Sequence, residues 1–131
     1  HLVVIATRTD AEAMPDQRIA RTLATSGLPE SEFEGFRAMM VGAISARPAE
    51  TRVWWLKAQT YIPLGIMIAT ASLLGIDTGP MEGFDTDAVD KLLGLREKNL
   101  TATTMLALGY RAEEPKLPKV RREYGDVVEI I

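Results

Sequence analysis

The chain has 131 residues, of which 47% are hydrophobic and 25% are charged, and its formal net charge is −3 at pH 7. These values are typical of one soluble globular domain, and the acidic balance argues against a protein that binds nucleic acid through its phosphates. Cysteine is absent and the only histidine is His1, which excludes a cysteine or histidine metal site and a histidine-based catalytic triad.

The N-terminal third predicts one strand and two helices. Residues 2–6 form a continuous apolar run rich in β-branched side chains, which indicates a strand buried on both faces. A short helix is expected over residues 16–23, after Pro15. Ser31 and Glu34 have the spacing of a capping box, so a second helix is expected to begin at Ser31.

A long apolar helix is predicted from Pro48 to Leu74. Its apolar residues cover more than one face, which a domain of this size rarely buries alone, so we expect a subunit interface along it. Pro63 lies inside the pattern and should kink the helix or remove one hydrogen bond. The apolar part, residues 61–74, is shorter than the roughly 20 residues of a membrane span. With no secretory signal visible either, we expect a cytoplasmic protein without a membrane partner.

Residues 80–85 combine proline, glycine and a carboxylate between two helical patterns. This combination predicts a tight turn with accessible backbone N–H groups. Such a turn serves either as a ligand-binding corner or as an ordinary connection, and the local pattern fits both. Asp85 or Thr86 is expected to cap a short helix over residues 86–93, which Gly94 stops.

Two further strands are predicted in the last third of the chain. Residues 100–108 are small, apolar and β-branched, and residues 112–118 form an extended connector. Residues 126–131 are the third candidate, and an apolar strand at a terminus needs a sheet edge in its own or another subunit. Strands separated by helices predict an α+β or α/β layered domain, with a sheet that is incomplete in this chain.

Several segments share their pattern with one enzyme family. In chain order these are Trp55 with Gln59 one helical turn later, then residues 74–85, 92–98, 108–111 and 117–121. With them the chain resembles the FMN-dependent NAD(P)H nitroreductase family. We expect residues 1–131 to be the C-terminal portion of a single nitroreductase-like domain, since the family's N-terminal segment, which binds the FMN phosphate with Arg and Ser, is absent from this sequence.

The resemblance implies an α+β fold in which helices surround a mixed sheet, and a homodimer that exchanges its C-terminal strand. It implies an oxidoreductase with FMN at the subunit interface and NAD(P)H as co-substrate. Hydride would pass to flavin N5 and then to a nitroaromatic, a quinone or a related small-molecule acceptor, in ping-pong order. The alternative is a truncated relative that acts as a non-catalytic dimerisation or binding module.

The resemblance also implies which residues face the flavin ring. Glu82 and Gly83 would present backbone N–H groups to flavin N5 and O4. Gly83 would let the backbone approach the ring without a Cβ in the way. Pro80 and Met81 would cover one face of the ring. No side chain is expected to act as a catalytic acid or base, because hydride transfer to the flavin needs none.

Three more residues are implied at the edges of the site. Lys119 and Arg121, two apart on an extended segment, would meet the FMN phosphate. The alternative for both is a solvated basic patch. Gln59 would reach the flavin that the partner subunit mainly binds, with packing on its own helix as the alternative.

Overall fold

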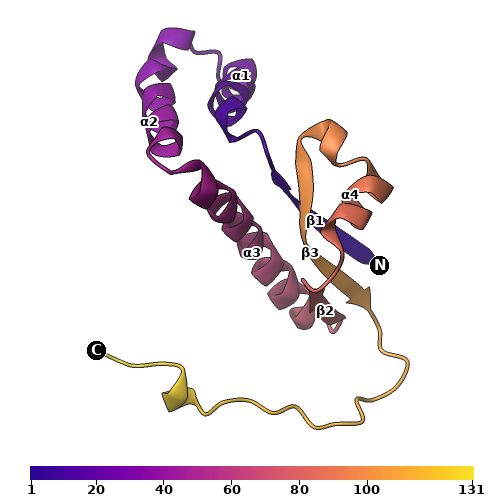
Figure 1. Ribbon diagram of the computed structural model, residues 1–131. Helices are drawn as coiled ribbons and strands as arrows, with labels where there is room; N and C mark the ends of the chain where they lie inside the picture. Colours follow the sequence, from indigo (N-terminus) through magenta and orange to yellow (C-terminus); the bar gives the residue numbers. More distant parts are fainter.

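The computed structural model describes residues 1–131 as a small sheet crossed by a long helix, with two helices beyond one end and an extended C-terminal arm (Figure 1). The strands are β1 (Leu2–Arg8), β2 (Asp77–Met81) and β3 (Leu100–Gly109). The α-helices are α1 (Met14–Ser26), α2 (Glu34–Ser45), α3 (Ala49–Leu73) and α4 (Thr86–Leu93). Short 3-10 helices cover Ala11–Ala13, Glu30–Phe33, Arg96–Lys98 and Tyr124–Asp126.

β3 is the centre of the sheet, which is antiparallel in the order β1-β3-β2. All residues from 101 to 106 are buried, and Ala102 and Leu106 are fully enclosed. α3 packs across all three strands and α4 packs against β3 (Figure 1). The strand predicted over residues 100–108 is confirmed, because its small and β-branched side chains suit a strand with a neighbour on each side.

β1 is confirmed as a strand, but the expectation that it is buried on both faces is wrong. Only Thr7 is buried, and the other residues are partly or fully exposed. The reason is that β1 lies at an edge of the sheet in this chain and pairs with β3 alone. Its apolar run therefore lacks the cover that a central strand would have.

The tight turn predicted over residues 80–85 begins as a strand. Pro80 pairs with Leu106, and Met81 pairs with Met105. Proline is tolerated there because β2 is an edge strand and needs no N–H on its open side. The connection itself is residues 82–85, which we call the 82–85 loop. The three strands form an antiparallel sheet, so the prediction of a mixed sheet is wrong for this chain.

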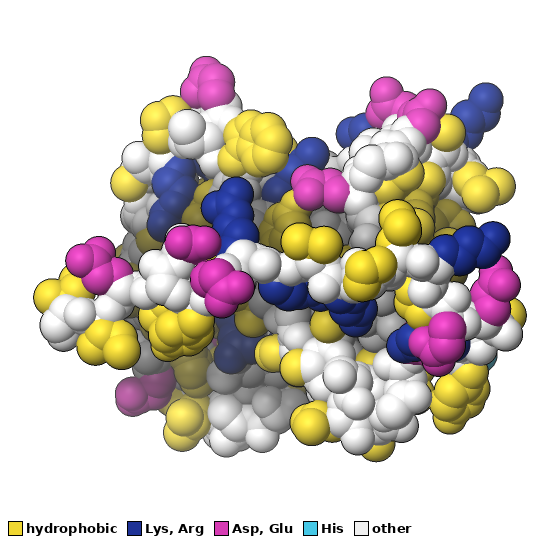
Figure 2. Space-filling model, turned by 90° about the horizontal axis from the view of Figure 1, so that it is seen from below, with side chains coloured by type: hydrophobic (Ala, Val, Ile, Leu, Met, Phe, Trp, Pro, Cys, Tyr) yellow, Lys and Arg dark blue, Asp and Glu magenta, His cyan; other side chains and the backbone are white.

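The strand predicted over residues 126–131 is absent. A short 3-10 helix covers Tyr124–Asp126, and every residue from 111 to 131 is exposed. These residues leave the sheet as an extended arm (Figure 1). Figure 2, seen from the side of the arm, shows hydrophobic side chains exposed in several groups on this face. A strand requires a neighbouring edge, and the arm pairs with neither β1 nor β2, the two edge strands of the sheet.

α1 is confirmed and is longer than predicted, with Pro15 in its first turn. The capping box at Ser31 is wrong. Ser31 lies in the 3-10 helix Glu30–Phe33, and α2 begins at Glu34 without a side-chain cap. A backbone bond from the Glu32 N–H to the Pro29 carbonyl, at 3.2 Å, occurs where the cap was expected.

α3 confirms the long helix and runs through Pro63 without interruption. Proline has no N–H, so the Gln59 carbonyl loses its usual partner one turn later, which is the predicted loss of one hydrogen bond. The helix buries a single stripe, Leu56, Thr60, Leu64 and Ala71, of which Leu56 packs against Ala11 and Ile44. No helix of the structure has the length and hydropathy that crossing a membrane requires.

Candidate functional site

The 82–85 loop joins β2 to α4 beside the middle of α3. A pocket of about 180 Å³ lies between the loop, α3 and β3. Its lining includes Lys57 and Tyr61 from α3, Glu82 from the loop and Thr103 from β3. Asp85 ends the loop as the predicted cap of α4, because its Oδ1 accepts a hydrogen bond from the Ala88 N–H at 3.0 Å.

Only one of the four backbone N–H groups of the loop, that of Phe84, donates a hydrogen bond within the chain. Neither the Glu82 N–H nor the Gly83 N–H donates a hydrogen bond within the chain. A Cβ added at Gly83 would meet no atom within 4 Å, so nothing inside the chain requires glycine there. Two donors beside an open backbone can serve a flat acceptor such as a flavin edge. The residues present therefore fit the N5 side of an FMN site.

Pro80 and Met81 lie next to these donors at the exposed end of β2. Met81 is 41% exposed, so its side chain is free to cover a flat ligand. The structure thus brings together four of the predicted residues, which are consecutive in the sequence. Whether they contact a flavin stays a prediction.

Tyr61 is a residue of this site that the sequence analysis did not single out. The Glu82 carboxylate lies at the same pocket as the Tyr61 hydroxyl and raises the pKa of that phenol. The pair connects the loop to α3. In the sequence, Tyr61 is one more apolar member of the helix pattern, and only its position beside Glu82 in the fold identifies a different role.

Gln59 lies on an exposed part of α3 and is not among the residues that line the pocket beside Glu82. Its side-chain amide donates to the Trp55 carbonyl at 3.3 Å. The chain therefore does not bring Gln59 to its own 82–85 loop. A contact with the flavin of a partner subunit stays a prediction.

Lys119 and Arg121 are exposed on the C-terminal arm. Arg121 donates to the neighbouring Val120 carbonyl at 3.0 Å. No hydrogen bond or ion pair joins the arm to the 82–85 loop of the same chain. The chain therefore does not connect Lys119 and Arg121 directly to the loop, and a contact of these two residues with an FMN phosphate stays a prediction.

The base of the arm is fixed by Asp77 and Arg111. The Arg111 N–H and Nε donate to Asp77 Oδ2 at 3.1 and 2.9 Å, and Nη2 pairs with Oδ1. These bonds lower the pKa of Asp77 from 3.8 to about 2, with a smaller contribution from the Lys119 charge. This ion pair determines where the arm leaves the sheet.

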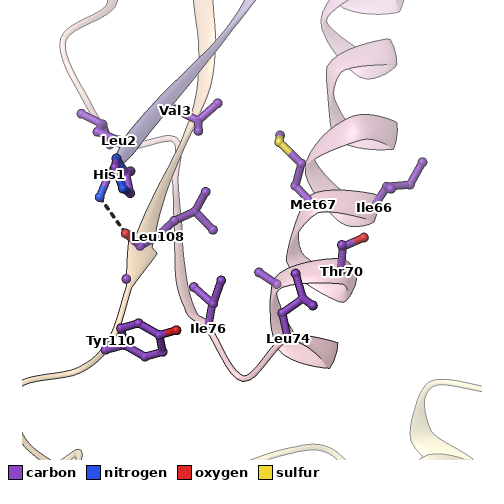
Figure 3. Close-up of a pocket in the computed structure, with 12 residues that line it drawn as sticks. His1, Leu2, Val3, Ile66, Met67, Thr70, Leu74, Ile76, Leu108 and Tyr110 are labelled. Atoms are coloured by element: carbon purple, nitrogen blue, oxygen red, sulfur yellow. Dashed lines mark hydrogen bonds between the residues drawn. The ribbon is translucent and has the colours of Figure 1, made fainter.

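A larger cavity of about 860 Å³ lies between the C-terminal half of α3 and the sheet. Figure 3 shows Met67 of α3 and Leu74, which follows the end of α3, on the opposite side of the cavity from Leu108 and Tyr110. Nine of its twelve lining residues are hydrophobic, and none of the predicted cofactor residues is among them. Its chemistry suits packing of apolar groups and offers no charged side chain to a flavin phosphate.

The sequence matches the model of the nitroreductase family over residues 6–110. The chain belongs to the nitroreductase family. A Staphylococcus epidermidis relative, named provisionally as an NAD(P)H nitroreductase, is 35% identical over 98% of this chain and 62% of its own length. The chain spans between 35% and 62% of the length of the curated relatives to which it is similar.

Solved structures share the nitroreductase fold. A provisionally assigned nitroreductase of Bacillus subtilis matches with a TM-score of 0.78 at 17% identity, over 99% of this chain and 63% of its own. A nitroreductase of Exiguobacterium sibiricum, also provisionally assigned, was solved in complex with FMN. It matches with a TM-score of 0.77 at 15% identity, over 98% of this chain and 60% of its own. The predicted α+β, nitroreductase-like fold is confirmed, and so is the predicted family.

Proposed function

We propose that the protein is an FMN-dependent oxidoreductase that uses NAD(P)H to reduce nitroaromatics, quinones or related small molecules. The observation that carries the proposal is the pair of unbonded N–H groups at Glu82 and Gly83. Membership of the nitroreductase family and the FMN complex of the Exiguobacterium sibiricum protein support it. We place this activity in the cytoplasm, where reduced nicotinamide is supplied.

The chain would hold and tune the cofactor through its backbone. FMN, when bound, supplies the redox chemistry by taking up a hydride from NAD(P)H and passing electrons to the acceptor. The N–H groups of Glu82 and Gly83 would donate to the N5 and O4 side of the ring. Fixed donors favour the additional electron density there and need no rearrangement during the reaction. Pro80 and Met81 would shield one ring face from water.

A homodimer is part of the proposal. The outer face of α3 exposes large apolar side chains, with Trp54 at 70%, Ile62 at 61% and Ile66 at 62%. The arm exposes more of them, including Leu117 and Ile130. Apolar surface of this extent favours association with a second subunit. The arm of one subunit would then lie on its partner, where a strand could form.

The dimer would also account for the separated cofactor residues. Lys119 and Arg121 would bring two positive charges to the FMN phosphate, at a flavin whose ring lies beside the 82–85 loop. Gln59 would reach the same flavin from the neighbouring copy of α3. Each flavin would thus be held by residues from two chains, and none of these side chains exchanges a proton in the reaction.

The test is whether the purified protein binds FMN and turns over. We expect a yellow protein with flavin absorbance in the blue, and FMN-dependent oxidation of NAD(P)H when a quinone or nitroaromatic is added. A colourless protein that does not bind added FMN would contradict the proposal. That result would favour the non-catalytic binding module instead.

A further inference from the structure

Both ends of the 82–85 loop are tied to the same strand. On one side β2 ends at Met81, which pairs with Met105 of β3. On the other side α4 packs against β3. The loop itself contains one internal backbone hydrogen bond, of 2.9 Å. The position of the Glu82 and Gly83 N–H groups is therefore set by how β2 and α4 are held on β3.

Asp90 makes the connection between α4 and β3. Its Oδ1 accepts a hydrogen bond from the Ala102 N–H at 2.7 Å, and its Oδ2 accepts one from the Thr101 hydroxyl at 2.9 Å. Oδ2 also forms an ion pair with Arg96, with 2.7 Å to Nε. Asp90 is only 1% exposed. A buried carboxylate is stable only with such partners, so these contacts fix its position.

No other residue of α4 is buried. The helix has eight residues, and Asp90 lies little more than one turn after the capping residue Asp85. A short helix moves as a rigid unit, so a shift at Asp90 is passed on to Asp85 and the loop. No apolar side chain of α4 is buried, so apolar packing does not hold the helix on β3 in the way that Asp90 does.

We propose that Asp90 is a positioning residue for the flavin. By holding α4 on β3 it fixes the Glu82 and Gly83 N–H groups relative to flavin N5. It thereby sets the midpoint potential of the flavin and the rate of its reduction, because donors at that edge favour the electron density that reduction adds. The proposal rests on the proposed function for the identity of the ligand.

Two variants and one matched control isolate this role. Asp90→Asn keeps the size of the side chain but replaces an acceptor oxygen with a donor NH₂, and Thr101→Val removes one donor while the carboxylate stays. Asp87→Asn is the control, since it makes the same change on the same helix. Asp87 also pairs with Arg96, at 2.9 Å, but its side chain is 91% exposed.

The first measurement uses the protein without FMN. Hydrogen exchange at Ala88 and Val89, whose N–H groups bond to Asp85, reports on the junction of the loop and α4. We expect exchange there to be about tenfold or more faster in Asp90→Asn and Thr101→Val, and unchanged in Asp87→Asn. Equal exchange in all four proteins would overturn the anchoring role.

The second measurement uses the protein with FMN. We expect a lower flavin midpoint potential in Asp90→Asn and Thr101→Val, and a kcat about 10- to 100-fold lower with little change in KM for NAD(P)H. Faster exchange with an unchanged potential would overturn the proposal, because Asp90 would then only stabilise α4. If the wild-type protein binds no FMN, the proposed function fails, and the positioning of a flavin fails with it. The exchange data still show whether Asp90 holds the loop.

Discussion

The ion pair of Asp77 and Arg111 joins two residues that are 34 positions apart in the sequence. The pKa of Asp77 falls from 3.8 to about 2, so the pair stabilises the folded protein above pH 4 and loses this effect as the pH falls toward 2. We predict that Asp77→Asn lowers the thermal unfolding temperature near neutral pH. The difference in unfolding temperature between the wild-type protein and Asp77→Asn should disappear between about pH 4 and pH 2.

Glu113→Gln is the control for Asp77→Asn, since Glu113 is exposed and makes no ion pair. It should shift the unfolding temperature little at any pH. A gap between the wild-type protein and Asp77→Asn that stays constant as the pH falls to 2 would contradict the account. Unfolding temperatures measured by circular dichroism over this pH range decide between the two results.

The arm residues Lys119 and Arg121 are predicted to bind the phosphate of the cofactor. Changing both to Gln should raise the Kd for FMN by about 100-fold or more, because each of the two lost charged hydrogen bonds costs about 1.5–3 kcal/mol. The Kd for riboflavin, which has no phosphate, should stay the same. Lys116→Gln is the control. Equal losses for FMN and riboflavin would assign the two residues to a different role.

Residues that act through neighbours in the chain could be predicted from the sequence, and residues that act across the fold could not. The Asp85 cap follows from its spacing to Ala88, three positions later. Asp90 meets Thr101 only after β3 comes to lie beside α4. Tyr61 likewise meets Glu82 through the packing of α3 on the sheet. The family resemblance supplied the loop residues, since a glycine in a turn has many possible uses.

At the scale of elements, α4 depends on its cap as well as on Asp90. Asp85→Ala should lower the free energy of unfolding by about 1 kcal/mol, because the Ala88 N–H loses its acceptor. Asp85→Ser can still accept that bond and should cost little. Urea unfolding followed by circular dichroism measures both. An equal loss in the two variants would show that the cap itself contributes nothing.

The elements whose own residues favour their structure were predicted, and those that depend on neighbours were not. β3 and α3 have the β-branched and apolar patterns of a strand and a helix, and the structure confirms them. β2 contains Gly79 and Pro80, which are poor strand formers, and it exists because it pairs with β3. Residues 126–131 are the reverse case, since they have a strand pattern but pair with neither edge of the sheet.

At the scale of the whole molecule, the C-terminal arm is almost independent of the body. Beyond Arg111 it forms no hydrogen bond or ion pair with the body, and Glu114 pairs only with Arg111 at the base of the arm, at 2.8 Å. We predict that removing residues 112–131 leaves the helix content of the remaining chain intact and converts a dimer into a monomer. Removing only residues 129–131 is the control and should leave the dimer largely in place.

Sedimentation and circular dichroism test this prediction together. The expected result is a halved molecular mass with an unchanged spectrum per residue for the part that remains. A shortened protein that stays dimeric would place the interface on α3 alone. A shortened protein that unfolds would show that the arm supports the body through contacts that a single chain does not make.

The central claim is that a flavin lies against the backbone of Gly83. Gly83→Ala and Gly83→Val add atoms where the chain itself has open space, whereas the control Gly79→Ala places its Cβ at an ordinary 3.8 Å from that of Ala107. The account predicts that all three variants unfold at nearly the wild-type temperature. FMN affinity, measured by quenching of flavin fluorescence, should be lower in Gly83→Ala and lower still in Gly83→Val. It should stay unchanged in Gly79→Ala. Wild-type FMN affinity in Gly83→Val would contradict the account.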